Sequence, residues 1–407
     1  MSAIIPTALP PGEPVSSRLF PSYFLAGFEC STHRLRAHRP GGLGRRLDVV
    51  ASSGHEAWAA ADYTRCTRIG IRTVREGLRW HLVERTPRHY DWSRELPRLR
   101  AARAAGVHVI WDLFHYGWPD DLDIFSPAFV DRFAAFSRAF AALHREESDA
   151  PVWVAPVNEP SFIAWGGGDV GYLNPFQRGR GGELKRQLAR AAVAACAAVR
   201  DVDPRARLCH IDPVIHIVPN PARPGERGAA DAHRLGMFEA WDMIAGRREP
   251  ALGGDPRWLD VVGVNYYERN QWVHRGRVLP PGDPLHRPFA DILAEVHARY
   301  GRPLFVAETG REGELRPAWL RYVAGEVRRA VAAGLPVEGI CWYPILNHPG
   351  WDDDRHLTCG LWDYPPDAAG GRPVYEPLLE ELERQQALFG GEEEGTAVGV
   401  GDHMPGC

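Results

Sequence analysis

The chain has 407 residues, of which 44% are hydrophobic and 25% are charged, and its formal net charge is −4. These values are those of a globular protein, and they lack the basic excess of proteins that bind nucleic acids or anionic lipids. No run of 18 or more apolar residues could span a bilayer, so we expect a soluble protein with neither nucleic acid nor a membrane as its partner.

The seven cysteines are scattered, odd in number and free of C-x-x-C spacing, which argues against a disulfide framework or a zinc site. Residues 1–17 lack the basic start and the continuous apolar stretch of a signal peptide, and their four prolines predict an irregular lead-in. Reduced thiols and the missing signal peptide together predict a cytoplasmic protein.

Eight short segments rich in β-forming residues recur along the chain, separated by longer stretches with helical spacing. Their apolar runs are continuous rather than alternating, which is typical of parallel strands covered by helices. The predicted strands are residues 23–28, 71–77, 107–114, 152–158, 206–212, 259–265, 303–308 and 337–343.

Helix signals occur between these strands. Ser126 and Pro127 form an N-cap and first-turn pair. The apolar residues that then share one helical face are Phe129, Phe133, Phe136, Phe140 and Leu143. Gly70 and Gly334 each follow a helical stretch and precede a strand, as C-terminal caps do.

The count of eight strands favours a closed (β/α)8 barrel of class α/β over an open, doubly wound sheet. An open nucleotide-binding sheet would carry a G-x-G-x-x-G turn after its first strand, and LAGFECST lacks it. The glycines of GGGDVG at 166–171 do not lead straight into a helix, so we predict a flexible loop there rather than a phosphate cradle.

One barrel over residues 18–388 accounts for most of the chain, because no internal linker separates two cores. Residues 32–54 and 213–231 are expected to be insertions that decorate this barrel. Residues 389–407 lack periodicity and, after Phe389, aromatic anchors, so we predict a disordered tail.

The active site of such a barrel lies at the carboxyl ends of its strands, so polar residues at those ends are the candidates. They are Glu29, Arg75, Glu76, Asp112, His115, Asn158, Glu159, Asp212, Asn265, Tyr266, Tyr267, Glu308, Trp342 and Tyr343.

Two of these carboxylates end strands that are otherwise apolar, Glu159 in VAPVNEP and Glu308 in LFVAETG. Burying an ionised carboxylate without a partner is costly, which favours a functional role for both. A pair of carboxylates opposed across a barrel mouth suits glycoside hydrolysis. Retaining enzymes hold them about 5–5.5 Å apart, whereas inverting enzymes leave roughly 6.5–9.5 Å for a water.

Seven segments between residues 24 and 364 resemble, in order, those of clan A glycoside hydrolases, and in particular family 1, the β-glucosidases and 6-phospho-β-glucosidases. The segments are FLAG, VREGLRWHLVERTPRHYDW, DLFHYGWPDDL, VNEP, DVVGVNYYERN, VAETG, and CWYPILNHPGWDD followed by GLWDY. The resemblance implies a retaining (β/α)8 enzyme with an Asn-Glu pair ending its fourth strand and a nucleophilic Glu ending its seventh.

Carried over by position, the resemblance makes Glu308 the nucleophile and Glu159 the acid/base. It also implies that Asn158 binds the sugar 2-hydroxyl, and that Arg75 and Tyr267 hold Glu308 ionised and correctly aimed. His115 would bind another sugar hydroxyl, and Trp342 would form the apolar platform under the ring.

The sequence departs from family 1 mainly at the residues that bind the sugar hydroxyls. Glu308 is followed by Thr-Gly instead of Asn-Gly. The glutamine near the first strand that grips two sugar hydroxyls has no clear counterpart, and we prefer Glu29 over His33 or Arg34 as its replacement. The Glu-Trp pair after the eighth strand becomes NHPGWDDD, so we expect Trp351 with Asp352 or Asp353 to take its place.

The sequence therefore predicts a retaining, exo-acting β-glycosidase that hydrolyses a small β-glycoside through a covalent glycosyl-enzyme and needs no metal or other cofactor. A 6-phosphorylated sugar is not expected, because Arg355 is the one basic residue near the eighth strand end. The alternatives are a sugar-binding barrel without activity and a transglycosidase that uses the same carboxylate pair. The sugar, the leaving group and the oligomeric state stay open.

A metal-dependent barrel hydrolase is a further alternative. It would draw on His108, His115, His210 and His216. We consider it less favoured, because no His-x-His pair ends the first strand and the histidines fall on different faces or loops.

Overall fold

The computed structural model describes residues 14–37, 43–364 and 366–391. Most of the predicted lead-in 1–17 and of the predicted tail 389–407 lies outside the described residues. Phe389 is an exception, since its ring packs 4.6 Å from that of Tyr23 and 5.2 Å from that of Phe24. Placing this residue in the tail was therefore wrong, because an aromatic ring that is buried on the barrel is held in place by its contacts.

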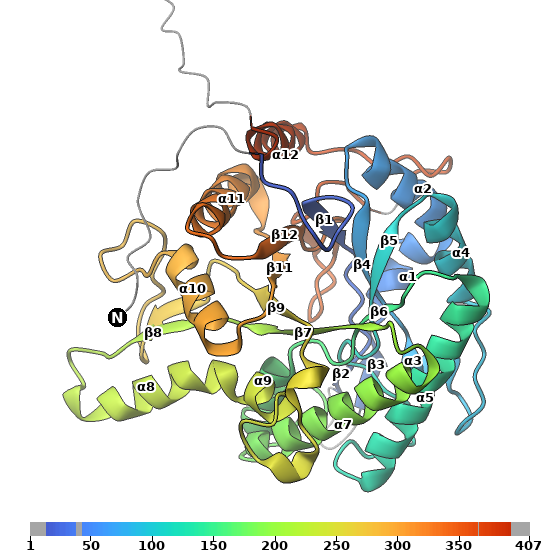
Figure 1. Ribbon diagram of the computed structural model, residues 1–407, viewed down its shortest axis with the longest axis horizontal. Helices are drawn as coiled ribbons and strands as arrows, with labels where there is room; N and C mark the ends of the chain where they lie inside the picture. Colours follow the sequence, from blue (N-terminus) through green and yellow to red (C-terminus); the bar gives the residue numbers. More distant parts are fainter. Residues whose placement is uncertain (1–13, 38–42, 365, 392–407) are drawn as a thin grey trace, which may run out of the picture.

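Within the described residues, eight parallel strands close into a barrel in the order β1-β12-β11-β9-β7-β6-β5-β4 (Figure 1). Each of the eight strands predicted from the sequence is present. Their bounds are β1 Phe24–Gly27, β4 Thr73–Gly77, β5 His108–Asp112, β6 Trp153–Ala155, β7 Arg207–Pro213, β9 Val261–Asn265, β11 Leu304–Thr309 and β12 Val337–Trp342.

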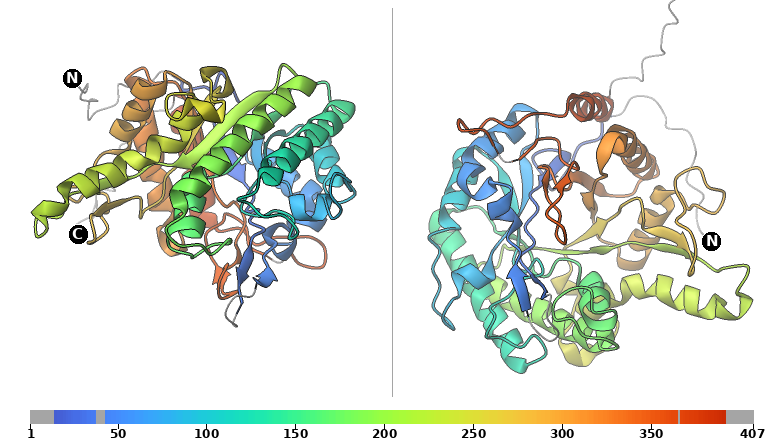
Figure 2. Two further views of the ribbon diagram at one scale, coloured as in Figure 1. Left: turned by 90° about the horizontal axis from the view of Figure 1, so that it is seen from below. Right: turned by 180° about the vertical axis from the view of Figure 1, so that it is seen from behind.

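Helices follow the barrel strands and surround them (Figure 2). Those that alternate with the strands are α2 His55–Arg68, α4 Leu96–Ala104, α5 Pro127–Glu147, α7 Gly181–Val202, α9 Glu239–Ile244, α10 Phe289–Tyr300, α11 Arg316–Ala332 and α12 Glu376–Phe389. Shorter helices are α1 Val49–Ser52, α3 Trp80–Val83, α6 Pro160–Ile163 and α8 Arg227–Leu235. Single turns are η1 Ala164–Asp169, η2 Pro224–Glu226, η3 Gly236–Phe238, η4 Pro250–Leu252, η5 Pro256–Trp258 and η6 Gly313–Leu315.

The helix signals of the sequence act largely as predicted. The phenylalanines of α5 are buried, and this helix packs alongside α7. Ser126 precedes α5, but its hydroxyl donates to the backbone oxygen of Asp123 instead of capping the helix. Gly70 (φ +79°) and Gly334 (φ +85°) end α2 and α11 in the left-handed conformation that glycine adopts without strain.

Successive residues of a strand point to opposite sides, so each barrel strand contributes to two packing layers. The interior layer includes Leu25, Ile110, Ile211, Phe305 and Cys341. The outer layer packs against the helices and includes Phe24, Val262, Val306, Ile340 and Trp342. Gly263 lets the interior close, because a Cβ there would lie 2.7 Å from the side chain of Ile211.

The predicted insertions contain short strands of their own. In the first, β2 Arg34–Arg36 pairs antiparallel with β3 Leu43–Arg46. In the second, β8 His216–Val218 pairs in parallel with β10 Gln271–Val273. After the last barrel strand, β13 His348–Pro349 pairs antiparallel with β14 His356–Leu357.

The glycine cluster at 166–171 is not the flexible loop that the sequence suggested. Residues 164–169 form the π-helical turn η1, and Gly166, Gly167 and Gly168 are buried in it. A Cβ on Gly168 would lie 2.7 Å from the Cα of Gly181, at the start of α7. The glycines therefore allow close backbone packing, a use that composition alone does not distinguish from flexibility. Among the described helices, none is long and apolar enough to cross a membrane.

Candidate active site

Arg75 joins four barrel strands at their carboxyl ends. Its guanidinium is fully buried and donates to Glu308 Oε1 at 3.0 Å and to the backbone oxygen of Ala307 at 2.7 Å. It also donates to Asp112 Oδ2 at 2.6 Å and to Asn158 Oδ1 at 3.2 Å. Burial alone would lower the pKa of Arg75, but Asp112 and Glu308 raise it well above its usual value. Arg75 thus places a permanent positive charge among the carboxyl ends of these four strands.

Glu308, on β11, is 4% exposed and receives a donor on each carboxylate oxygen. Arg75 binds Oε1, and the hydroxyl of Tyr267 donates to Oε2 at 2.9 Å. Both contacts stabilise negative charge on this side chain, and together they fix the orientation of the carboxylate plane.

Glu159, just after β6, has a different environment. The hydroxyl of Tyr116 donates to its Oε2, and Asn265 Nδ2 donates to its Oε1 at 2.9 Å. Burial and the negative charge of Glu308 nevertheless raise the pKa of Glu159 to about 8. Glu159 is therefore held in its protonated form at neutral pH, beside a carboxylate that accepts hydrogen bonds from an arginine and a tyrosine.

The backbone is strained where the Glu159 carboxyl group is bound. Glu159 has φ +49° and Tyr116 has φ +70°, a region that side chains other than glycine rarely adopt. The N–H of Glu159 donates to the backbone oxygen of Ile211 on β7 at 3.0 Å, and Pro160 then begins α6. Such strain persists only where surrounding structure enforces it, and it occurs preferentially at functional sites.

His115 and Asn158 contact each other beside Asp112, at the end of β5. His115 Nδ1 is 2.9 Å from Asp112 Oδ2, and its Nε2 is 3.4 Å from Asn158 Nδ2. Burial would lower the pKa of His115, but Cys30, Asp112 and Glu29 raise it well above its usual value. The imidazole can therefore present a donor at Nε2 to a bound molecule.

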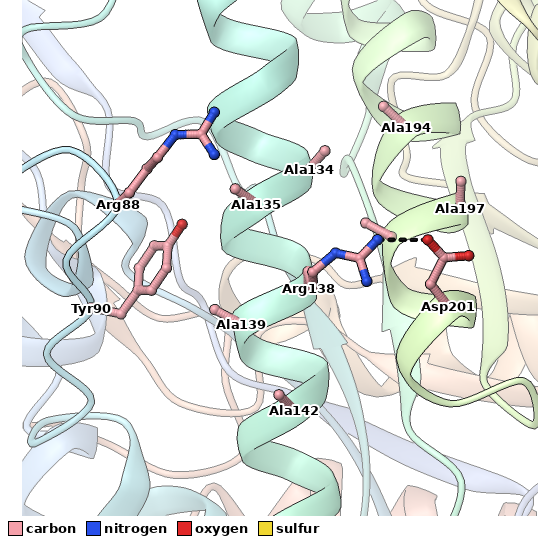
Figure 3. Close-up of a pocket in the computed structure, with 11 residues that line it drawn as sticks. Arg88, Tyr90, Ala134, Ala135, Arg138, Ala139, Ala142, Ala194, Ala197 and Asp201 are labelled. Carbon is pink, nitrogen blue, oxygen red and sulfur yellow. Dashed lines mark hydrogen bonds and ion pairs between the residues drawn. The ribbon is translucent and has the colours of Figure 1, made fainter.

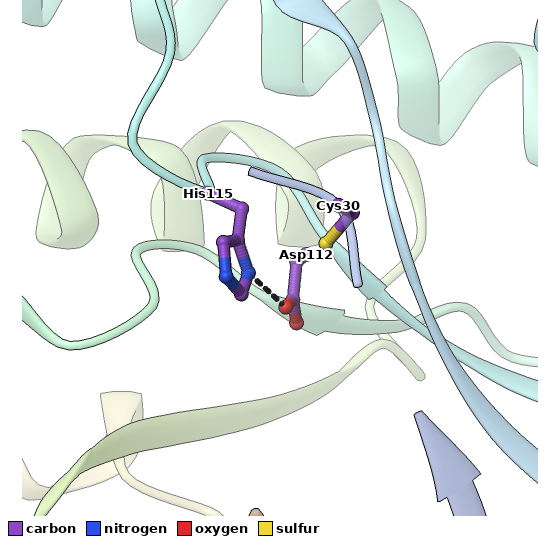
Figure 4. Close-up of side chains that lie close together, drawn as sticks. All are labelled: Cys30, Asp112 and His115. Carbon is purple, nitrogen blue, oxygen red and sulfur yellow. Dashed lines mark hydrogen bonds and ion pairs between the residues drawn. The ribbon is translucent and has the colours of Figure 1, made fainter. Parts of the chain in front are cut away.

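Cys30, Asp112 and His115 form one group of potential metal ligands, with ligand atoms within 4.8 Å of one another (Figure 4). The Arg75 guanidinium and His115 both occupy Asp112 Oδ2. A cation there would face the fixed positive charge of Arg75, so the geometry favours hydrogen bonding over metal binding. The other histidines considered for a metal lie elsewhere: His108 stands beside Trp153, His210 faces the backbone oxygen of Trp258, and His216 is on β8.

Glu29 lies beside this network, where it lines a pocket of about 380 Å³, the Glu29 pocket, together with His348, Trp351, Asp352 and Arg355. Its Oε1 accepts from the backbone N–H of Ser31 at 3.0 Å. Burial would raise the pKa of Glu29, but His115 and His348 lower it. Glu29 therefore presents a charged carboxylate at the wall of the pocket.

Trp351 and Asp352 come from the loop between β13 and β14. The indole of Trp351 packs edge-on at 5.7 Å from Tyr116 and at 5.1 Å from His33. Asp352 is exposed and accepts from the hydroxyl of Tyr172 at 3.0 Å. The side chain of Tyr116 therefore links Trp351 to Glu159, whereas Asp352 lies at the rim of the Glu29 pocket.

The structure places Trp342 away from the site, so its predicted role as the sugar platform was wrong. Its indole N–H donates to the backbone oxygen of Cys359 at 3.0 Å. Its ring lines a small apolar hollow with Leu320, Leu361 and Leu378, between the barrel and the helices α11 and α12. The reason is the alternation of side chains along a strand, which directs Trp342 outward.

Tyr343, the next residue, takes the inward position. The guanidinium carbon of Arg75 lies 5.1 Å from its ring centroid. Its ring is parallel to that of His115, with centroids 6.0 Å apart, and its hydroxyl donates to the backbone oxygen of Phe28 at 3.3 Å. Tyr343, and not Trp342, therefore forms the aromatic wall at the end of the eighth strand.

Four residues of the network had no role predicted from the sequence: Asp112, Asn265 and Tyr343 were named only as candidates at strand ends, and Tyr116 was not a candidate. Three of them stand at strand ends, which was the signal available in the sequence. Tyr116 had no such signal, since it follows His115 in a loop and its contact with Glu159 depends on its positive φ.

Another hollow, of about 640 Å³, lies on the outer side of α5 and α7 (Figure 3). Alanines such as Ala135 and Ala139 line it, and Arg138 and Asp201 form an ion pair of 2.6 Å across it. None of the predicted site residues lines this groove.

Comparisons with known proteins connect this architecture to glycosidases. No family model matches the chain. A curated β-galactosidase of Sulfolobus acidocaldarius is 24% identical over an alignment of 317 residues, with 65% of this chain and 63% of that protein covered. The chain thus spans less than two thirds of the length of this relative.

Solved structures agree over much more of the chain. A family 1 β-glucosidase from Thermotoga maritima superposes with a TM-score of 0.73 at 16% identity, over 93% of this chain and 100% of that one. A β-glycosidase from Thermosphaera aggregans gives a TM-score of 0.72 at 17% identity, over 92% and 98%. At this identity the likeness shows the fold, and it confirms the (β/α)8 barrel.

Proposed function

We propose that this protein is a retaining, exo-acting β-glycosidase, a divergent relative of family 1, which hydrolyses a small β-glycoside. One observation carries the proposal: Glu159 and Glu308 are buried at strand ends in opposite electrostatic environments. Arg75 and Tyr267 donate to the two carboxylate oxygens of Glu308, whereas burial and the charge of Glu308 raise the pKa of Glu159 to about 8. A nucleophile and a general acid need this difference.

In the first step, a Glu308 oxygen attacks the anomeric carbon while Glu159 transfers its proton to the departing glycosidic oxygen. The bond to the leaving group breaks, and an ester to Glu308 forms. Because the ester carries no charge, the pKa of Glu159 falls, and its carboxylate can then accept a proton from water. Water attacks the anomeric carbon, the ester bond breaks, and Glu308 and protonated Glu159 are restored.

Asn158 is suited to bind the sugar 2-hydroxyl. Its Oδ1 accepts from Arg75 at 3.2 Å, so its amide nitrogen is turned toward the site. That nitrogen has only long contacts, 3.3 Å to Tyr116 Oη and 3.4 Å to His115 Nε2. A 2-hydroxyl can therefore take a better hydrogen bond there, which strengthens as charge develops on the sugar.

The remaining sugar contacts are assigned by position. Glu29 and His115 would bind hydroxyls, and Tyr343 would form the apolar wall in place of Trp342. Trp351 and Asp352 would border the sugar on the side of the loop between β13 and β14. These residues are the ones that set the sugar preference, because a missing hydrogen-bond partner strongly disfavours a substrate.

An unphosphorylated sugar fits this pocket better than a 6-phosphate. Arg355 is the one arginine that lines the Glu29 pocket, and it donates to both oxygens of Glu312, at 2.9 Å to Oε2. The names of the similar proteins, a β-galactosidase and β-glucosidases, one of the latter with glucoimidazole, also support a neutral hexose. Hydrolysis is favoured over mere binding because both carboxyl groups and their partners are in place.

Hydrolysis of aryl β-glucoside, β-galactoside, β-xyloside, β-mannoside, β-fucoside and β-glucuronide, measured side by side, tests this function. We expect turnover of at least one neutral glycoside and little of the glucuronide. Proton NMR during the first turnovers should show the β-anomer of the free sugar. The α-anomer as the first product would contradict a retaining mechanism, and unchanged substrate throughout would favour a sugar-binding barrel. Glycosides as the main products would identify a transglycosidase.

A further inference from the structure

A second pocket, of about 400 Å³, adjoins the proposed active site; we term it the hairpin pocket. It lies between the β2–β3 hairpin and the segment that follows η1. The residues that line it with polar or charged side chains are His33, Arg34, Arg36, Tyr172, Arg178 and Asp352. The hairpin pocket and the Glu29 pocket share Tyr172 and Asp352, whose hydrogen bond of 3.0 Å stands between them.

Arginines in and beside the hairpin pocket are incompletely neutralised. Arg34 and Arg46 share a single carboxylate, that of Asp120. Arg36 donates to the backbone oxygen of Gly171, and its guanidinium carbon lies 4.7 Å above the ring of Phe176.

Arg178 has no side-chain hydrogen bond or ion pair within the part of the chain that the structure describes. Within the described residues, the hairpin pocket and the ion pairs of Arg34 and Arg46 bring together four arginines and two carboxylates, those of Asp120 and Asp352. A net positive charge is therefore left for a ligand.

The Glu29 pocket has the opposite charge. It is lined by Glu29, Asp352 and Asp353, and its arginine, Arg355, is engaged by Glu312. Two pockets of opposite charge that share one hydrogen-bonded pair of residues provide a means to distinguish the two ends of a substrate by charge. A negatively charged group is repelled from the Glu29 pocket and attracted to the hairpin pocket.

Two side chains connect the hairpin pocket to the proposed proton donor. His33, which lines the pocket, packs edge-on against Tyr116, with ring centroids 6.1 Å apart. Tyr116 in turn donates to Glu159, the proposed proton donor to the leaving oxygen.

We propose that the hairpin pocket binds a carboxylate or phosphate carried by the leaving group, so that the preferred substrate is a β-glycoside with an anionic aglycone. This proposal rests on the glycosidase function proposed above. The guanidinium groups of Arg36 and Arg178 would bind the anion, because arginine donates to carboxylate and phosphate oxygens in pairs.

The test compares 4-carboxyphenyl and 4-carbamoylphenyl β-glycosides of the sugar that the enzyme hydrolyses best. The two leaving groups have similar shape and differ in charge. The ratio of their kcat/KM values is measured in the wild type and in Arg36→Gln/Arg178→Gln, so that intrinsic reactivity cancels. We expect the ratio to fall about tenfold in the double variant, as for the loss of charge-assisted hydrogen bonds at a partly exposed site. Added salt should lower the wild-type ratio as well.

Arg138→Gln serves as the matched control, because Arg138 is an exposed arginine on α5, paired with Asp201 and outside the pocket. Its ratio should equal that of the wild type. A ratio that stays at the wild-type value in Arg36→Gln/Arg178→Gln would overturn the proposal. A 4-phosphonooxyphenyl β-glycoside distinguishes the two anions: the one whose rate falls more in the double variant is the better ligand.

Binding of the 4-carboxyphenyl β-thioglycoside, which is not hydrolysed, is measured by calorimetry to separate the two proposals. Tighter binding than for the carbamoyl analogue in the wild type, with the difference lost in Arg36→Gln/Arg178→Gln, supports the anion pocket even if no glycoside is hydrolysed. Equal binding of the two analogues in the wild type contradicts the anion pocket, whatever the activity. Circular dichroism of the double variant confirms that it is folded.

Discussion

Tyr116 donates its hydroxyl hydrogen to Glu159, and both residues hold a left-handed backbone, with φ +70° and φ +49°. They come from loops that follow neighbouring barrel strands, β5 and β6. The strained conformations thus direct two side chains toward each other and position the carboxyl group that we propose as the proton donor.

Removing this hydroxyl should change the pH dependence of catalysis. The donor stabilises the ionised form of Glu159, so Tyr116→Phe should raise the pKa of Glu159 above its value of about 8. Because the general acid must be protonated, the fall of kcat/KM at high pH should move to higher pH, with the maximum reduced about tenfold. A pH–rate profile measures both effects. Tyr90→Phe, which removes a hydroxyl far from the site, should leave the profile unchanged, and a shift to lower pH in Tyr116→Phe would contradict the assignment.

The two carboxyl groups should respond differently to replacement. Glu308→Gln should lose activity by at least about a thousandfold, because no covalent ester can form. Glu159→Ala should lose about a hundredfold to ten-thousandfold on poorly activated substrates. Azide should restore the rate of Glu159→Ala on an activated aryl glycoside and yield the β-glycosyl azide, detected by mass spectrometry and NMR. Near-normal turnover in either variant would exclude the proposed mechanism.

Glu159 should also make stability depend on pH. The pKa of Glu159 is about 8 in the folded protein and 4.5 is its ordinary value, so the folded state holds a proton that the unfolded chain releases. The stabilisation by this proton is complete below pH 4.5 and is lost as the pH rises toward 8. Glu159→Gln does not titrate, so its free energy of unfolding should match that of the wild type near pH 4.5 and exceed it at pH 8 by on the order of a few kcal/mol.

Urea unfolding at the two pH values measures this difference. Glu183→Gln, at an exposed position on α7, is the control and should not gain stability at the higher pH. Equal differences between wild type and Glu159→Gln at both pH values would show that the carboxyl group is not held protonated.

Arg75 should be required for stability as well as for activity. Arg75→Met would leave Asp112 and Glu308 buried without their cation, which we expect to cost about 3–5 kcal/mol of unfolding free energy. Arg138→Met removes an exposed ion pair and should cost less than about 1 kcal/mol. Chemical denaturation measures the loss of unfolding free energy in both variants. A loss in Arg75→Met as small as that in Arg138→Met would show that other groups compensate the buried charges of Asp112 and Glu308.

Tyr343 should take the role in sugar binding that the sequence suggested for Trp342. Trp342→Phe loses a hydrogen bond on the outer side of the barrel and should reduce stability by about 1 kcal/mol while kcat and KM stay near wild type. Tyr343→Leu removes the inward aromatic wall and should raise KM about tenfold. Steady-state kinetics and thermal unfolding of both variants check this reversal, which a large kinetic effect of Trp342→Phe would contradict.

Much of the fold could be predicted because it depends on local patterns. Continuous apolar runs identified all eight barrel strands, and Gly70 and Gly334 marked helix ends through a conformation that glycine adopts without strain. The glycines at 166–168 were misjudged, because glycine also serves close packing, and a sequence does not state which neighbour will approach.

The site was predicted only in part. Residues at the end of an apolar strand, such as Glu159, Glu308 and Arg75, are directed by the barrel to one common mouth, so their type and position suffice to nominate them. Trp342 was misplaced because neighbouring residues of a strand face opposite sides, and a difference of one position turns a pocket wall into a helix contact.

The sequence by itself determined that this chain forms a parallel (β/α)8 barrel with an amide and two carboxylates at its strand ends, because strand periodicity and strand termini are local properties. Only the tertiary structure decided which of two adjacent aromatics faces inward, that Tyr116 reaches Glu159, and that two pockets of opposite charge meet at Tyr172 and Asp352. Those features join loops that are far apart in the chain. Their geometry follows from how the barrel closes, and no short stretch of sequence encodes it.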